Sequence, residues 1–117
     1  MARPRNFNED EVIERAAGAF GRLGYAGCSG DDLVEATGLQ RGSLYKTFGS
    51  KRGLFEQVLR RALAGQWQHD PAALDLLITA LRELASFDLL IAALCREALA
   101  ASSQDPVRLL GSRLLEH

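Results

Sequence analysis

The chain has 117 residues, of which 47% are hydrophobic and 25% charged, and its formal net charge is -1. This length allows about one domain, and the composition is that of a globular protein rather than a disordered chain. No apolar run is long enough to cross a membrane, and the first residues lack the apolar core of a secretion signal, so a cytoplasmic protein is expected. The two cysteines, Cys28 and Cys95, are too few for a disulfide framework or a cysteine-held metal, and no cofactor is predicted.

The first half of the chain carries the signals of four helices. Asn8, Ser29 and Ser50 are side chains of the kind that cap helix N-termini, and each precedes apolar residues at helical spacing. Glycines follow these runs, as is typical of helix C-termini. The pattern predicts helices over residues 9–23, 30–37, 40–47 and 51–64.

The second half continues without a strand signal. Asp70-Pro71 and Asp105-Pro106 each place a capping residue before a proline at the first helical position. The fifth helix begins at the first of these starts and ends at a break near residues 86–88. The sixth helix follows the break and runs to about Ala101, and the seventh begins at the second start. Residues 65–71 are expected to form a polar linker, in which Trp67 packs over the end of the preceding helix. An all-α fold with seven helices is therefore predicted.

Two of these helices are short and are joined by a tight turn at Gly38, which is the arrangement of a helix-turn-helix. The second helix of this motif lies in the major groove of DNA. Leu39, Leu44 and Phe48 are expected to face the core. The opposite face would present a guanidinium that reads guanine, hydroxyl groups, a cation and a glycine that permits close approach of the backbone: Arg41, Gly42, Ser43, Tyr45, Lys46 and Thr47.

Basic residues are concentrated around this predicted motif. Residues 36–61 contain six Lys and Arg residues against Glu56 alone, although the whole chain is slightly acidic. A local basic surface, rather than the net charge, attracts phosphate. Lys51 begins the helix over 51–64, where a cation opposes the helix dipole unless a phosphate binds at the same helix N-terminus.

An ordered set of segments between residue 8 and about residue 60 resembles the TetR family of bacterial transcriptional repressors. The matching segments are Phe20 with Gly24-Tyr25, Ser29 with Asp31-Asp32-Leu33, Ala36-Thr37-Gly38-Leu39, Gly42-Ser43-Leu44-Tyr45, Phe48, Ser50-Lys51 and Leu54-Phe55. The resemblance implies base-edge or groove contacts by Arg41, Gly42, Ser43, Lys46 and Thr47, and phosphate contacts by Ser29, Tyr45 and Lys51. Two features depart from the family: Gln40 stands where a small capping residue is common, and residues 65–117 are shorter than the usual C-terminal region.

The expected organisation has three parts. Residues 1–64 would form a three-helix DNA-binding domain with the helix-turn-helix, and residues 65–114 a short helical region for dimerisation and effector binding. Residues 115–117 resemble the start of an expression tag. A homodimer is predicted because the C-terminal helices carry more leucines than so short a region is expected to hide: Leu76, Leu77, Leu89, Leu90, Leu94, Leu99, Leu109, Leu110 and Leu114.

The predicted function is that of a dimeric transcriptional repressor that binds a palindromic operator in double-stranded DNA. A small apolar effector would bind in a cavity among the fourth to sixth helices. The alternatives are a helical protein-interaction module and a regulator without effector sensing. An enzyme is not expected, because no serine–histidine–aspartate or paired-carboxylate arrangement of catalytic character is recognisable. Cys95 is interpreted as a small buried residue, and neither cysteine is expected to be a redox sensor.

Overall fold

A computed structural model describes residues 8–116 of the chain. Residues 1–7, which open the predicted first domain, and His117, of the predicted tag remnant, lie outside the described residues. Residues 8–116 form helices without a strand, so the predicted all-α fold is confirmed. The elements are α1 (Glu9–Leu23), α2 (Gly30–Thr37), α3 (Arg41–Phe48), α4 (Lys51–Ala64), the 3-10 helix η1 (Trp67–His69), α5 (Pro71–Glu83), α6 (Leu89–Ala101) and α7 (Pro106–Leu115).

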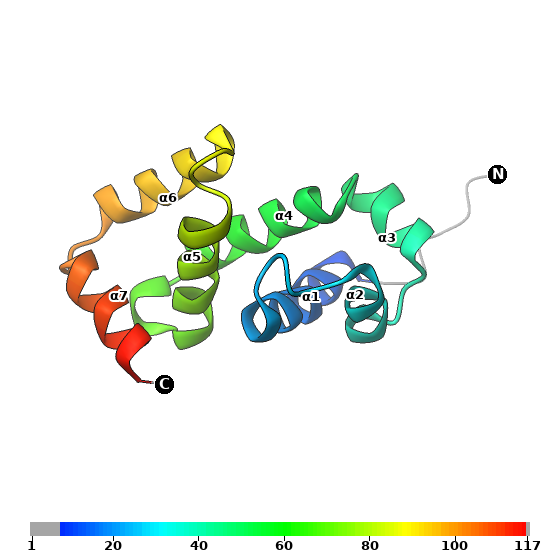
Figure 1. Cartoon of the computed structure of the whole chain (residues 1–117), viewed down its shortest axis with the longest axis horizontal. Helices are drawn as coiled ribbons and strands as arrows, with labels where there is room; N and C mark the ends of the chain where they lie inside the picture. Colours follow the sequence, from blue (N-terminus) through cyan, green and yellow to red (C-terminus); the bar gives the residue numbers. More distant parts are fainter. Residues whose placement is uncertain (1–7, 117) are drawn as a thin grey trace.

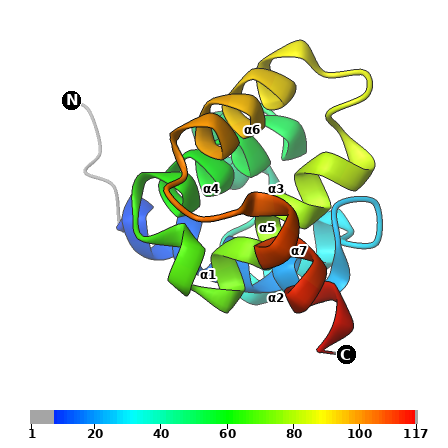
Figure 2. The same ribbon diagram turned by 90° about the vertical axis from the view of Figure 1, so that its left-hand side faces the viewer.

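The helices form an elongated body of 51 × 27 × 26 Å. α2 and α3 lie at one end, α7 lies at the other, and α4 runs along the molecule between them (Figure 1). Viewed from the end that carries α7, the last three helices lie in front of α1 to α4 (Figure 2). The short helices α2 and α3 are therefore far from the C-terminal helices, and α4 connects the two ends.

The helices begin where capping side chains satisfy the first backbone N–H groups. Asn8 Oδ1 accepts hydrogen bonds from the N–H groups of Asp10 and Glu11, at 2.9 and 3.4 Å. At α2, Ser29 and Asp32 form a complete capping box, in which each side chain accepts a hydrogen bond from the backbone N–H of the other residue. Ser50 Oγ accepts from the N–H of Gly53 at 2.9 Å. These three predicted caps are confirmed, as are those of Asp70 at α5 and Asp105 at α7.

The turn between α2 and α3 has the expected glycine conformation. Gly38 has φ 77°, in the left-handed region that glycine enters without steric cost, and its N–H donates to the carbonyl of Val34. Thr37 closes the turn, because its hydroxyl donates to the carbonyl of Leu33 and accepts from the N–H of Leu39. Gln40, at the N-cap of α3, makes no side-chain capping bond. α3 therefore begins without the side-chain cap that the other α-helices among residues 8–116 have.

One apolar core runs through the described helices. Phe20 of α1 and Phe55 of α4 are fully buried at its centre, and Leu33 and Leu44 hold α2 and α3 against them. Leu39 and Phe48 are half-buried against the same core, so the three apolar residues of the predicted recognition helix face inward as expected. The same core continues into α5 and α6. The predicted boundary near residue 64, between a DNA-binding domain and a C-terminal helical region, stays a prediction.

The expected polar linker over 65–71 is wrong in one respect, because η1 interrupts it. Trp67 begins η1 and is only 4% exposed, in contact with the core that α4 and α5 share. Burying the indole ring gives this short segment a fixed conformation that its polar neighbours do not provide. The predicted packing of Trp67 is confirmed.

The C-terminal helices hide only some of the leucines that the dimer prediction uses. Leu76 and Leu77 are 3% and 0% exposed within the single chain, so they are wrong as dimer contacts. α7 is held to α5 by a two-pronged ion pair between Arg113 and Asp75, at 2.7 and 2.8 Å. The large apolar side chains left exposed in this half are Phe87, Leu89, Leu90, Val107, Leu114 and Leu115.

Candidate nucleic-acid interface

The predicted contact residues lie on α3 and on the N-terminal ends of α2 and α4. Arg41, Gly42, Ser43 and Lys46 are exposed on α3, and Ser29 is exposed at the N-cap of α2. Tyr45, Thr47 and Lys51 are partly buried. The eight residues therefore all reach the surface, and five of them are largely accessible.

The small hydroxyl residues already make internal hydrogen bonds. Ser29 Oγ accepts from the N–H of Asp32 at 3.0 Å and donates to Asp32 Oδ2 at 2.9 Å. These bonds from the backbone and side chain of Ser29 lower the pKa of Asp32. Thr47 Oγ1 donates to the carbonyl of Ser43 at 3.0 Å. Any contact of these hydroxyls with an external group must use their remaining hydrogen-bonding capacity.

Gly42 differs from these residues because nothing in the chain fills the space next to it. A Cβ atom built at this position meets no heavy atom within 4 Å. Its φ lies in the ordinary helical range, so neither backbone geometry nor internal packing accounts for a glycine here. The missing side chain leaves the backbone of α3 bare towards the outside.

Lys51 is held by an aromatic ring. Its Nζ lies 4.5 Å from the centroid of the Tyr25 ring, within the range of a cation–π contact. Tyr25 stacks on Phe20 at 5.9 Å and meets Phe55 edge-on at 5.3 Å, so the ring is fixed from behind by the core. Burial is the main cause of the raised pKa of Tyr25. The ring compensates for the unfavourable position of the lysine at a helix N-terminus and fixes the direction of its ammonium group.

Arg52, the next residue of α4, connects this region to the C-terminal helices. Its guanidinium donates to both carboxylate oxygens of Asp88, at 2.7 and 2.9 Å, and to Glu56 at 2.6 Å. Asp88 also caps α6 by accepting from the N–H of Ile91. The hydrogen bonds from Arg52 lower the pKa of Asp88 to about 2. The start of α4 is thereby fastened to the start of α6.

These pairings change the charge of the predicted basic surface. Among residues 36–61, the four arginines all pair with carboxylates, some of which come from outside that window: Asp31 with Arg41, Asp88 and Glu56 with Arg52, Glu56 with Arg60, and Asp10 with Arg61. Within residues 8–116, Lys46 and Lys51 have no such ion pair. The positive surface is therefore smaller than the charge count indicates and centres on the two lysines.

The turn that follows α1 is also tied to a distant carboxylate. Glu83, at the end of α5, accepts hydrogen bonds from the backbone N–H groups of Tyr25 and Ala26, both at 2.9 Å. Gly24 has φ 79°, and a Cβ there would lie 2.9 Å from Glu83 Oε2. Sequence reasoning missed Tyr25, Glu83 and Asp88 as supports of the surface. The Gly24-Tyr25 segment was part of the family resemblance, but nothing local to Glu83 or Asp88 indicated their partners.

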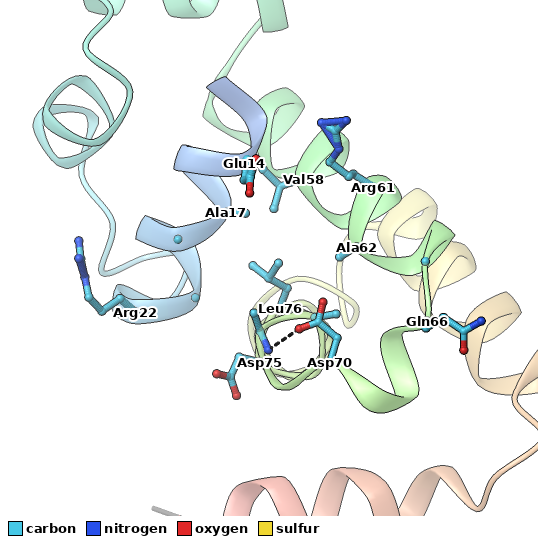
Figure 3. A pocket seen from close by; sticks show the side chains of 15 residues that line it. Glu14, Ala17, Arg22, Val58, Arg61, Ala62, Gln66, Asp70, Asp75 and Leu76 are labelled. Atoms are coloured by element: carbon cyan, nitrogen blue, oxygen red, sulfur yellow. Dashed lines mark hydrogen bonds between the residues drawn. The ribbon is translucent and has the colours of Figure 1, made fainter. Parts of the chain in front are cut away.

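A wide groove lies elsewhere, between α1, α4 and α5. This groove has a volume of about 730 Å³. Ala17, Val58 and Leu76 converge in it, whereas the side chains of Arg22 and Arg61 point outward (Figure 3). A smaller hollow of about 270 Å³ lies between α4 and α6. The effector cavity was expected among α4, α5 and α6, and each of the two hollows is lined by two of these helices.

Further chemical features are few in the part of the chain that the structure describes. No group of three or more histidine, cysteine or acidic residues is placed to hold a metal ion there. No described helix is long and apolar enough to span a membrane. Cys95 is buried, as predicted, and Cys28 is buried too; burial raises the pKa of Cys95 to about 11. A thiol with so high a pKa is a poor nucleophile at neutral pH.

Comparison with known proteins covers the same part of the chain as the helix-turn-helix. Residues 12–58 match the family described as bacterial regulatory proteins, tetR family. An uncharacterized HTH-type transcriptional regulator, YezE of Bacillus subtilis (strain 168), is 41% identical over 66 residues, which cover 56% of this chain and 34% of that protein. The HTH-type transcriptional repressor ComR of Escherichia coli (strain K12) is 44% identical over 59 residues, covering 50% and 28%.

A third relative is the biofilm operon icaADBC HTH-type negative transcriptional regulator IcaR of Staphylococcus aureus (strain Newman), 33% identical over 52 residues, or 44% of this chain and 28% of that protein. The matches therefore span about a third of the length of these relatives. The helix-turn-helix, its supporting helices and the family match agree on the class of this part of the chain: residues 12–58 form a domain of the kind found in bacterial regulatory proteins of the tetR family. The resemblance found in the sequence is confirmed.

The ion pair of Asp88 gives a prediction for stability against acid. Because the pKa of Asp88 falls from 3.8 to about 2 on folding, its contribution is complete above about pH 4 and is lost as the pH falls towards 2. The shift corresponds to roughly 2 kcal/mol, of which we expect about 1 kcal/mol after solvent screening. Asp88→Asn, which keeps a capping side chain, should therefore lower the free energy of unfolding by about 1 kcal/mol at neutral pH and by progressively less towards pH 2.

Urea unfolding followed by the fluorescence of Trp67, the single tryptophan, measures this difference. Asp105→Asn is the matched control, because Asp105 caps α7 without an ion pair among residues 8–116. A destabilisation by Asp88→Asn that stays constant down to pH 2 would contradict the role of the Arg52 pair.

Proposed function

We propose that this chain is a transcriptional repressor that binds a palindromic operator in double-stranded DNA as a homodimer, in the cytoplasm. Residues 1–64 would form the DNA-binding domain, and residues 65–114 would carry the dimer contacts. The observation that supports this most directly is the geometry of α2 and α3, a helix-turn-helix whose second helix buries Leu44 and exposes a polar and cationic face. The names of ComR and IcaR as repressor and negative regulator agree with this proposal.

The contacts divide into those that read bases and those that hold phosphates. Arg41, Gly42, Ser43, Lys46 and Thr47 lie on α3 and would face the major groove, where Arg41 has the geometry to bind the O6 and N7 atoms of guanine. Ser29, Tyr45 and Lys51 would contact the DNA backbone. For Lys51 the supporting observation is its position at the N-terminus of α4, with its ammonium group fixed over Tyr25.

A salt titration with operator and random DNA tests this division, after the operator has been found by binding-site selection. Lys51→Ala should weaken binding to both DNAs alike and reduce the slope of log K against log salt by about 0.9 per subunit, because one fewer counterion is released. Arg41→Ala should cost about 1–3 kcal/mol on the operator and relax the preference at one position of each half-site. Arg108→Ala, at an exposed position of α7, is the control.

Equal losses from Arg41→Ala on both DNAs would show that Arg41 only positions the protein. Failure of the wild-type protein to bind any duplex at low salt would refute DNA binding. The helical protein-interaction module, or a regulator-like domain without DNA binding, would then be the better account of the fold.

Gly42 supplies a second test, because the isolated chain gives no reason for a glycine. Gly42→Ala should raise the free energy of unfolding by roughly 0.5–1 kcal/mol, since alanine favours the helix and its Cβ meets open space. On DNA, the same methyl group should weaken binding by about tenfold if the backbone of α3 approaches the groove closely. Gly18→Ala, at an exposed position of α1 that also has no neighbour within 4 Å, should stabilise similarly and leave DNA binding unchanged. Unchanged affinity in Gly42→Ala would rule out close approach at this position.

The dimer is proposed on a smaller set of residues than the sequence indicated. Leu89, the first residue of α6, is 90% exposed, and Phe87, just before the N-cap of that helix, is 73% exposed. Exposed apolar side chains of this size are better candidates for a dimer contact than the buried Leu76 and Leu77. Leu89→Glu should shift the protein from dimer to monomer in light scattering at micromolar concentration. Gln57→Glu, on an exposed position of α4, should leave the dimer intact. A wild-type protein that is monomeric at high micromolar concentration would overturn the proposal.

Release of DNA by a small molecule stays a prediction. The groove between α1, α4 and α5 is larger than the hollow between α4 and α6. One of the helices that line this groove is α4, which runs along the molecule between the α3 end and the α7 end (Figure 1). If an effector exists, this groove is the site we propose for it. A ligand bound there should change the fluorescence of Trp67, which lies at the adjoining junction of α4 and α5, and should lower the affinity for the operator.

A further inference from the structure

Arg41, which would read a guanine, is engaged within the chain before any DNA arrives. Its Nη2 atom lies 2.6 Å from Asp31 Oδ1, at the start of α2. The Asp31 side chain is 93% exposed and that of Arg41 55% exposed, so both groups also face solvent. Only one of the guanidinium's N–H groups is used by this carboxylate, because a single hydrogen bond joins the two side chains.

Gly30 provides a second observation at the same place. A Cβ atom built on Gly30 would lie 2.7 Å from Arg41 Nε and 2.8 Å from Arg41 Cζ, so the guanidinium occupies the space of the missing side chain. Gly30 is the first residue of α2 and has no positive φ, so the backbone does not require a glycine there. Asp31 and Gly30 thus form a seat for the Arg41 side chain. Asp31 attracts the guanidinium by its charge, and Gly30, which has no side chain, leaves space for it.

We propose that Asp31 and Gly30 together retain Arg41 on non-specific DNA and release it only to a guanine edge, which makes them determinants of sequence specificity. This inference rests on the proposed DNA-binding function and concerns its selectivity. A phosphate offers Arg41 an anionic oxygen partner of the same kind as the Asp31 carboxylate, so exchanging one for the other gains little. A guanine edge offers the O6 and N7 acceptors in the spacing that a guanidinium matches with two hydrogen bonds.

The consequence for non-specific binding follows from counterion release. While Arg41 stays on Asp31, the pair is neutral and contributes no phosphate contact, so random DNA gains nothing from this arginine. If the seat is removed, Arg41 becomes available to any phosphate and adds one contact to every sequence. The seat therefore lowers the affinity for random DNA, with which an operator must compete. Specificity is obtained here by weakening the non-specific complex.

Two variants remove the seat by different physical means. Asp31→Asn removes the charge, and Gly30→Ala keeps every charge but places a methyl group where the flexible end of Arg41 lies. Both should bind random duplex DNA about five- to tenfold more tightly at 0.1 M salt, with the salt slope steeper by about 0.9 per subunit. Affinity for the selected operator should change by about twofold or less, so the ratio of operator to random affinity should fall by several-fold in each variant.

Matched controls separate this effect from a general change of charge. Glu35→Gln removes another exposed acidic group of α2 and should leave the ratio as in the wild type. In an Arg41→Ala background, Gly30→Ala should have no effect on either DNA. Circular dichroism of each variant checks that α2 remains folded. We expect it to be folded because the capping box of Ser29 and Asp32 is left unchanged.

The outcomes distinguish this inference from the proposed function. If wild-type protein binds no duplex, the function itself fails. If it binds and Gly30→Ala leaves both affinities unchanged, the seat has no role in DNA recognition. If both variants lose affinity for the operator instead, Asp31 holds Arg41 in its reading position, and the proposed release is wrong.

Discussion

The contact of Phe20, Tyr25 and Phe55 is the interaction on which the position of α3 depends. Phe20 ends the buried stripe of α1, Phe55 lies in α4, and their rings meet edge-on at 5.1 Å with Tyr25 packed against both. Such pairs contribute about 0.5–1.5 kcal/mol each beyond the burial of their area. α3 itself is short and begins without a side-chain cap, so it holds its conformation through packing on α4 rather than through its own hydrogen bonds. The same ring of Tyr25 fixes Lys51, so that the core and the charged surface share one support.

Most of the fold could be predicted from the sequence because its signals are local. The caps at Asn8, Ser29 and Ser50 act on N–H groups two or three residues away, and Gly38 acts on its own turn. The helical spacing of Leu44 and its apolar neighbours then identifies the buried face of α3. η1 gives no comparable signal, because a single buried tryptophan among polar residues determines its conformation.

The surface was harder to predict because its electrostatics depend on residues that are distant in sequence. Counting charges over residues 36–61 left out Asp31, Asp88 and Asp10, which the fold brings to Arg41, Arg52 and Arg61. The leucine count failed for a related reason, since the sequence does not tell whether a leucine of α5 meets α4 or solvent. Leu77 is fully buried and Leu89 almost fully exposed, although both belong to apolar runs of the C-terminal half. Position on a helix was therefore predictable, whereas the partner across the core was not.

The carboxylate of Glu83 has a mechanical consequence for the whole molecule. It binds two consecutive N–H groups of the turn after α1, and Asp88, only five residues further along the chain, binds the first turn of α4. The corner between α5 and α6 therefore holds both segments that flank the helix-turn-helix, the turn before α2 and the first turn of α4. A displacement of this corner would act on both flanks of the α2–α3 pair at once, because each flank is bound to it through a carboxylate.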